Sequence, residues 1–146
     1  MDNKFGLFIH WGLYSIPAVH EQVLTNGDWP HDKYEALVCE FDPYRYDPDE
    51  WVSMAKNACM RYICFTAKHH DGFCMWDTKE TDYKITNTPY GKDTLKMLAD
   101  ACSRHDVALS IYYSIPDWHH PHAYNPLSSH QWKAKEKENN DFSIYK

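Results

Sequence analysis

Side chains that could hydrogen-bond a hydroxyl-rich ligand lie at or just after the ends of three apolar segments of this chain. His10 ends the first segment, the pair His69-His70 ends the second, and the pair Tyr112-Tyr113 ends the third. A neutral imidazole offers one donor and one acceptor, and a phenol hydroxyl offers both. If the three segments are neighbouring strands, these groups lie around one rim, where they would suit the hydroxyl groups of a sugar.

A metal ion is the alternative ligand for the same side chains, because zinc hydrolases on α/β barrels draw histidines from several strand ends. The candidate metal ligands are His10, His69, His70, His119 and His120. Adjacent side chains of an extended chain point in opposite directions, so His69 and His70 are not expected to bind one ion. We therefore expect no metal and no cofactor, and a metal-dependent barrel hydrolase remains the alternative.

The elements that would position these side chains are three continuous apolar segments at residues 5–11, 61–67 and 107–114. Such segments predict strands that are buried on both faces of a parallel sheet. Long polar loops follow the strands, at residues 12–31, 68–92 and 115–140. In α/β folds the active site lies in the loops at the carboxyl ends of the strands.

Helices are predicted between the strands. Asp47 and Pro48 form a helix start, with Asp as the N-cap and Pro at the first helical position. Asp93 or Thr94 can cap a second helix, and a shorter helix is expected over residues 32–39. The order of strands and helices predicts an α/β fold with a parallel sheet.

Composition excludes several classes of protein. The 146 residues are 43% hydrophobic and 25% charged, as in a folded domain rather than a disordered chain. No apolar run approaches the ~18 residues of a transmembrane helix, so no membrane partner is expected. The net charge of −6 is spread along the chain, which argues against nucleic acid as a partner.

Several motifs occur in an order that is typical of one family. The longest are KFGLFIHWGLYS at residues 4–15 and TAKHHDGFCMW at residues 66–76. Shorter matches lie in the expected order: Phe41-Asp42-Pro43, Trp51, Ala55-Lys56, Thr81-Asp82-Tyr83, Asn87-Thr88-Pro89 and Tyr112-Tyr113-Ser114. Through these motifs the chain resembles the N-terminal part of the glycoside hydrolase family 29 α-L-fucosidases.

The resemblance implies that residues 1–146 form the first three βα units of a (β/α)8 TIM-like barrel, truncated after the third unit. It implies an enzyme that releases terminal α-L-fucose with retention of configuration, through a glycosyl-enzyme intermediate. The expected partner is a fucosylated oligosaccharide or glycoconjugate. Members of this family are usually secreted, periplasmic or lysosomal, although the first residues lack the layout of a signal peptide.

The same resemblance implies which side chains contact the sugar. They are His10, Glu21, His69, His70, Trp76 and Tyr113. Tyr112 is the alternative to Tyr113. Gln22 stands where the family has a Trp beside the Glu, which removes one stacking contact unless Trp29 supplies it.

No catalytic residue is expected in this chain. In the family the nucleophile is an Asp on the fourth strand and the acid/base lies farther on, so both fall beyond Lys146. The local carboxylates Glu21, Asp71, Asp77 and Asp117 show no matched pair. We therefore expect the 146 residues alone to be inactive, and a non-catalytic carbohydrate-binding remnant is a further alternative.

Overall fold

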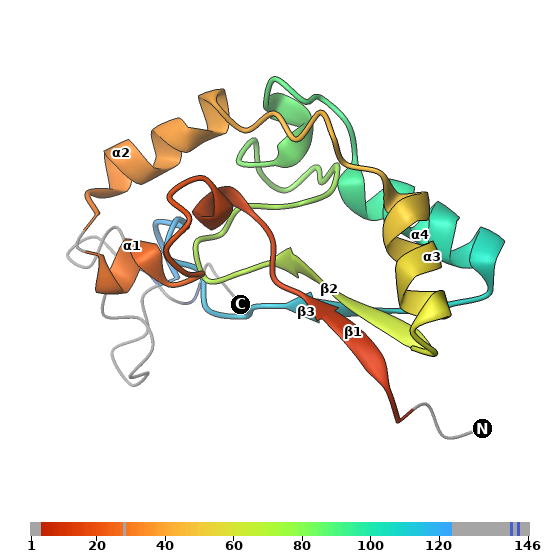
Figure 1. The fold of residues 1–146 in the computed structure, drawn as a ribbon. Coiled ribbons are helices and arrows are strands. Elements are labelled where there is room, and N and C mark those ends of the chain that lie inside the picture. The colour runs from red at the N-terminus through yellow and green to blue at the C-terminus, as the bar shows by residue number, and fades with distance from the viewer. Residues whose placement is uncertain (1–3, 28, 124–140, 142, 144–146) are drawn as a thin grey trace.

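A computed structural model describes residues 4–27, 29–123, 141 and 143. Three strands, four α-helices and three short 3-10 helices (η) are assigned within these residues (Figure 1). In chain order they are β1 (Gly6–Ile9), η1 (Leu13–Ser15), α1 (Val23–Asn26), α2 (His31–Glu35), η2 (Ala36–Cys39), α3 (Pro48–Asn57), β2 (Tyr62–Lys68), η3 (Ile85–Asn87), α4 (Thr94–His105) and β3 (Ala108–Tyr113). The predicted α/β class is confirmed.

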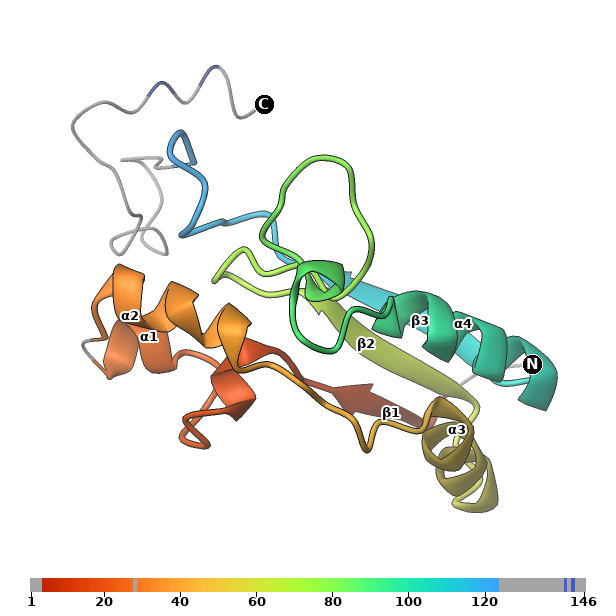
Figure 2. The ribbon, with the colours of Figure 1, turned by 90° about the horizontal axis from the view of Figure 1, so that it is seen from above.

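The three strands form a parallel sheet in the order β1-β2-β3, with β2 in the centre (Figure 2). Gly6 pairs with Tyr62, and Tyr62 in turn pairs with Ala108. A Cβ atom at Gly6 would collide with the Tyr62 ring, so glycine allows this close approach. The register shifts between Thr66 and Lys68, near the carboxyl end of β2.

Both predicted helix starts are confirmed. The Asp47 side chain accepts hydrogen bonds from the backbone N–H groups of Asp49 and Glu50, and Pro48 opens α3. For the second helix, Asp93 rather than Thr94 is the cap, because its carboxylate accepts from the Lys96 N–H. These caps satisfy N–H groups that have no partner within the helix.

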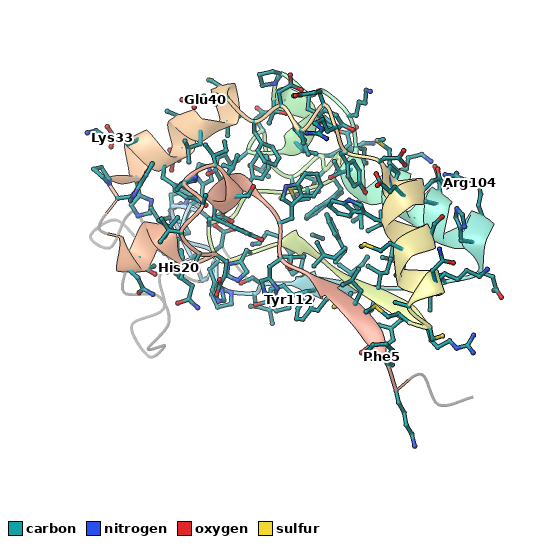
Figure 3. All side chains as sticks on the ribbon, viewed as in Figure 1. Phe5, His20, Lys33, Glu40, Arg104 and Tyr112 are labelled. Carbon is teal, nitrogen blue, oxygen red and sulfur yellow. The ribbon has the colours of Figure 1, made fainter. Side chains whose placement is uncertain are left out.

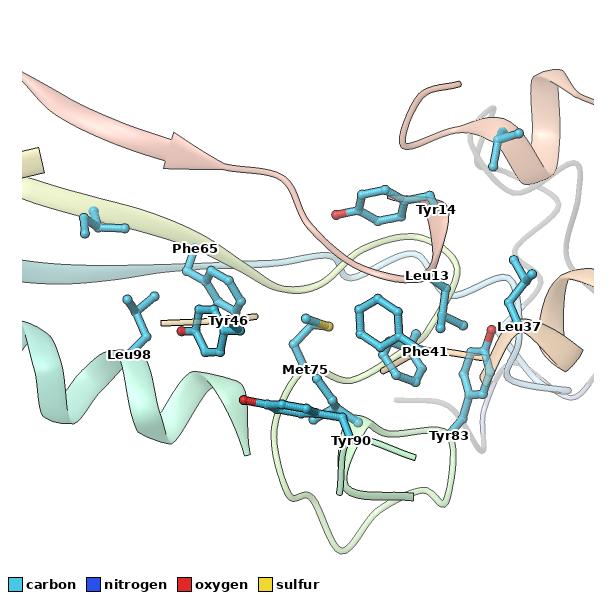
Figure 4. Close-up of a cluster of buried hydrophobic side chains, with 14 of the residues drawn as sticks. Leu13, Tyr14, Leu37, Phe41, Tyr46, Phe65, Met75, Tyr83, Tyr90 and Leu98 are labelled. Atoms are coloured by element: carbon cyan, nitrogen blue, oxygen red, sulfur yellow. The ribbon is translucent and has the colours of Figure 1, made fainter. Parts of the chain in front are cut away.

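Helices α3 and α4 cover the same face of the sheet (Figure 1), and the core extends from the space between them and β2 to the loops at the carboxyl ends of the strands (Figure 4). Ile63 and Phe65 of β2 are fully buried there. The outer strands are different, since Phe8 of β1 is 52% exposed and Ile111 of β3 is 54% exposed. Burial on both faces is therefore wrong for β1 and β3, because α3 and α4 lie on one face of the sheet and, within the described residues, each outer strand has only one neighbour that could shield its side chains.

The loop expected at residues 12–31 contains η1, α1 and the first residue of α2. The short helix expected at residues 32–39 is split into α2 and η2. Tyr34 and Leu37 point from this segment into the core. Among the described residues, no helix is both long enough and apolar enough to cross a bilayer.

Candidate functional site

The three histidines at the strand ends lie together. His10 follows β1, and its ring centroid is 5.6 Å from that of His69, which follows β2. The His69 and His70 rings are 4.5 Å apart. The strand ends at Lys68 and the chain then enters a turn closed by the Gly72 N–H on the His69 carbonyl. Within this turn the two rings have different partners, since His69 stacks on Tyr112 whereas His70 Nδ1 contacts Ser114 Oγ.

Of the two adjacent tyrosines at the end of β3, Tyr112 joins the histidine cluster. Its ring centroid lies 5.8 Å from those of both His10 and His69, and it is stacked on His69 at an angle of 24°. Figure 3 shows Tyr112 at the sheet. Tyr113 faces elsewhere, with the Lys68 Nζ 5.0 Å from its ring and the Trp76 ring 6.1 Å away. Successive side chains of a strand point to opposite faces, which separates the pair.

Glu21 and His10 line one cavity of about 310 Å³. The other lining residues are Tyr14, Ser15, Ala18, Val19 and His20. Sequence reasoning missed Tyr14, although it lies within the KFGLFIHWGLYS motif, and its ring also packs edge-on against His69 at 5.6 Å. The segment after β1 thus places a carboxylate and a phenol beside the histidine cluster.

Neither residue considered for the family's stacking contact lines this cavity. The Gln22 backbone N–H donates to His20 Nδ1, and Gln22 precedes α1 as its N-cap. The Trp29 ring packs edge-on against the Tyr34 ring, 6.3 Å away, in the partly buried layer around the core.

Trp76 and Tyr113 line a second cavity, of about 420 Å³. Its other lining residues are Lys68, Gly72, Cys74, Thr78, Glu80, Thr81, Ile115, Asp117, His119 and His120. The structure therefore divides the six expected sugar-contact residues into two groups. His10 and Glu21 line the first cavity, with His69 next to His10 and His70 next to His69, whereas Trp76 and Tyr113 line the second.

His69 is held neutral. Burial, followed by the neighbouring His70 and His10, lowers its pKa from 6.5 to about 4, and Glu21 acts in the opposite direction. A neutral imidazole keeps both a donor and an acceptor at neutral pH, which a protonated one does not.

Buried polar atoms without a partner gather around this cluster. Within the described residues, no hydrogen bond reaches His69 Nδ1, the Tyr14 hydroxyl or Thr66 Oγ1. Thr66 pairs with Tyr112 in the sheet register. Such unsatisfied groups are uncommon in folded proteins and often mark functional sites.

Comparison with known proteins agrees with this geometry. The family described as alpha-L-fucosidase matches residues 1–145. The chain belongs to the α-L-fucosidase family. It is 42% identical to α-L-fucosidase isoenzyme 1 from Paenibacillus thiaminolyticus, whose structure it matches over 98% of its own length and 35% of that chain, with a TM-score of 0.88.

Two further fucosidases show how much of a family member the chain spans. The Lactobacillus casei α-L-fucosidase AlfC, solved with its α-L-fucose product, is 30% identical with a TM-score of 0.86, over 97% of this chain and 51% of that one. The Dictyostelium discoideum α-L-fucosidase is 27% identical in an alignment that covers 82% of this chain and 31% of the relative. The chain thus spans about a third of the curated fucosidases it matches.

The aspartates of this fucosidase segment are engaged in structural contacts. Asp71 is buried and accepts from the Tyr34 hydroxyl at 2.7 Å, and burial raises the pKa of Asp71 to about 6. Asp117 accepts from Lys68 Nζ at 2.6 Å, and Asp77 accepts from Lys84 Nζ at 2.8 Å. Across residues 4–27 and 29–123, His, Cys, Asp and Glu side chains form no group of three that could hold a metal ion.

Proposed function

We propose that this chain is the sugar-binding part of a retaining α-L-fucosidase. The observation that supports this most directly is the convergence of His10, His69, His70 and Tyr112 from the ends of three adjacent parallel strands, in a chain of the fucosidase family. Residues 1–146 would then be the first three βα units of a (β/α)8 barrel. The parallel order β1-β2-β3 and the helices on one face of the sheet support this assignment.

The terminal fucose would bind at the first cavity. His10, His69 and His70 would exchange hydrogen bonds with its hydroxyls, and Glu21 would accept one more. The Tyr112 ring offers an apolar face beside them, which suits the C–H side of a sugar. A neutral His69 supports this role because it can donate and accept at once.

Trp76 and Tyr113 would contact the part of the substrate beyond the terminal fucose. Their rings lie 6.1 Å apart at the second cavity, which His10 and Glu21 do not line. A solved relative, AlfC with an Asp-to-Ala change, holds a fucosyl-GlcNAc disaccharide, so a longer sugar is bound within this family. The substrate class we propose is therefore a fucosylated oligosaccharide or glycoconjugate.

The catalytic carboxylates would come from outside residues 1–146. Retaining hydrolysis needs two carboxyl groups about 5–5.5 Å apart across the scissile bond. Asp71, Asp77 and Asp117 are each bound to a tyrosine or lysine in this chain, and Glu21 lines the cavity beside His10. We propose that the chain by itself binds sugar and does not turn it over.

A graft tests this function. Residues 1–146 replace the matching segment of the Paenibacillus thiaminolyticus fucosidase, and the hybrid and the isolated chain are assayed with an aryl α-L-fucoside. We expect turnover by the hybrid and none by the chain. If the hybrid binds fucose without turnover while the unmodified host fucosidase is active in the same assay, the result would support the alternative that this chain is a non-catalytic carbohydrate-binding remnant. A folded hybrid that neither binds nor hydrolyses the fucoside would refute the proposal.

A further inference from the structure

The short helix α2 is connected by hydrogen bonds to the loops that follow β2 and β3. Its adjacent residues Tyr34 and Glu35 reach two different loops. The Tyr34 hydroxyl donates to Asp71 Oδ2 at 2.7 Å, in the loop after β2, and Glu35 Oε1 lies 2.8 Å from His119 Nδ1, in the segment after β3. These partners are 37 and 84 residues away along the chain, so the contacts join parts that no local structure would bring together.

Asp71 lies in the turn that holds the paired histidines. It comes directly after His70, and the Gly72 N–H closes the turn on the His69 carbonyl at 3.1 Å. The second carboxylate oxygen of Asp71 accepts from the Phe73 N–H at 3.3 Å. The two oxygens of one buried carboxylate therefore connect α2 to the turn, and Tyr34 is the side chain that α2 contributes.

The environment makes this connection rigid. Tyr34 is 1% exposed and Asp71 is 2% exposed, so water cannot replace either partner. A buried carboxylate that loses a donor bears a desolvation cost that water would otherwise relieve. Burial and the adjacent Asp71 both keep the Tyr34 hydroxyl protonated, since each raises the pKa of Tyr34 far above its usual range.

We propose that Tyr34 is a positioning residue for the histidine cluster, acting on His69 and His70 through its hydrogen bond to Asp71. Without this bond, the turn at residues 69–72 loses its attachment to α2, and His69 becomes less buried. The consequence for sugar binding rests on the proposed function, whereas the placement of the His69 ring does not.

The pKa of the His69 imidazole is a measure of how deeply its ring is buried. Its pKa is lowered to about 4 chiefly by burial, with smaller contributions from His70 and His10 and an opposite one from Glu21. A His69 ring released from its buried position would titrate closer to the 6.5 of an exposed histidine. The titration can therefore be followed by NMR of the imidazole carbon-bound protons, with the 146-residue chain and without any substrate.

The test compares Tyr34→Phe with a matched control, Tyr46→Phe. Tyr46 is also a buried tyrosine, and its hydroxyl donates to the Thr94 carbonyl at 3.2 Å, near Leu98 at the other end of the core (Figure 4). Each change removes one buried hydroxyl, but Tyr34→Phe also leaves a buried carboxylate without a donor and should lose more stability, so the two variants are compared by the His69 pKa. We expect the His69 pKa to rise from about 4 to about 5 or above in Tyr34→Phe and to stay near 4 in Tyr46→Phe.

A second pair of variants tests the same bond from its other end. In Asp71→Asn the single amide oxygen can still accept from the Tyr34 hydroxyl, while the NH2 group replaces the oxygen that accepts from the Phe73 N–H, whereas Asp71→Ala offers no acceptor to either donor. We expect the His69 pKa to rise more in the Ala variant than in the Asn variant, because only the Asn variant can keep the bond to Tyr34. The inference is overturned if the His69 pKa is the same in Tyr34→Phe and Tyr46→Phe. If Tyr34→Phe does not fold, the inference is overturned when the His69 pKa is the same in Asp71→Asn and Asp71→Ala. Neither result depends on fucosidase activity.

Discussion

The buried His69 should make the folded chain less stable as the pH falls from 6.5 to 4. The folded state holds this imidazole neutral, with a pKa lowered to about 4 chiefly by burial. An unfolded histidine titrates near 6.5, so below that pH the unfolded chain binds a proton that the folded chain does not. The stability that His69 contributes is therefore present above pH 6.5 and lost as the pH falls through 4.

The magnitude follows from the gap between the two pKa values. At about 1.4 kcal/mol for each pH unit, a gap from 6.5 to about 4 corresponds to a loss of about 3 kcal/mol in the free energy of unfolding. Asp71 acts in the opposite direction, because burial raises its pKa from 3.8 to about 6 and the folded chain is the one that binds the proton in that window. The two contributions partly cancel in the unchanged protein, so variants are needed to separate them.

Urea unfolding followed by tryptophan fluorescence, at several pH values between 7 and 4, measures both contributions. Relative to the unchanged chain, His69→Gln should gain up to about 3 kcal/mol between pH 7 and pH 4. Asp71→Asn should lose stability relative to the unchanged chain over the same range, since it lacks the favourable protonation. A difference between His69→Gln and the unchanged chain that stays constant from pH 7 to 4 would show that His69 is not buried as described.

Three further outcomes are expected. In the grafted fucosidase, His69→Ala should lower kcat/KM for an aryl α-L-fucoside ten-fold or more, since sugar hydroxyls left without a partner cost ~1–3 kcal/mol each. The control His105→Ala should leave this kcat/KM unchanged, because His105 lies at the end of α4, next to Arg104 (Figure 3). Tyr112→Ala should raise KM for the aryl fucoside, whereas Tyr113→Ala should raise KM for a fucosylated oligosaccharide alone; equal effects on both substrates would contradict the division into two cavities. Asp47→Ala should lower the free energy of unfolding by ~1 kcal/mol through loss of the α3 cap, as measured by urea unfolding at pH 7.

Local sequence patterns are sufficient to predict the order of strands and helices and to select the histidines that lie together at the site. A continuous apolar segment predicts a strand because its side chains must leave water, and an Asp before Pro-Asp-Glu predicts a helix start because its carboxylate lies within reach of the next N–H groups. A parallel arrangement brings all three strand ends to one edge, so the sequence alone is enough to group His10, His69 and His70. The helix start depends on contacts between residues a few positions apart, and the strands depend on the run of apolar residues along the chain.

Tertiary structure alone decided which tyrosine faces the histidines and what holds the histidine turn. The register shift between Thr66 and Lys68 changes the pairing at the end of β2, where Tyr112 lies opposite Thr66 and Tyr113 opposite Lys68. Asp71 looks like a loop residue in the sequence, yet it is buried against Tyr34 from a helix 37 positions earlier. The low pKa of His69 has the same origin, because burial depends on how distant segments pack, and no local pattern of residue types contains that information.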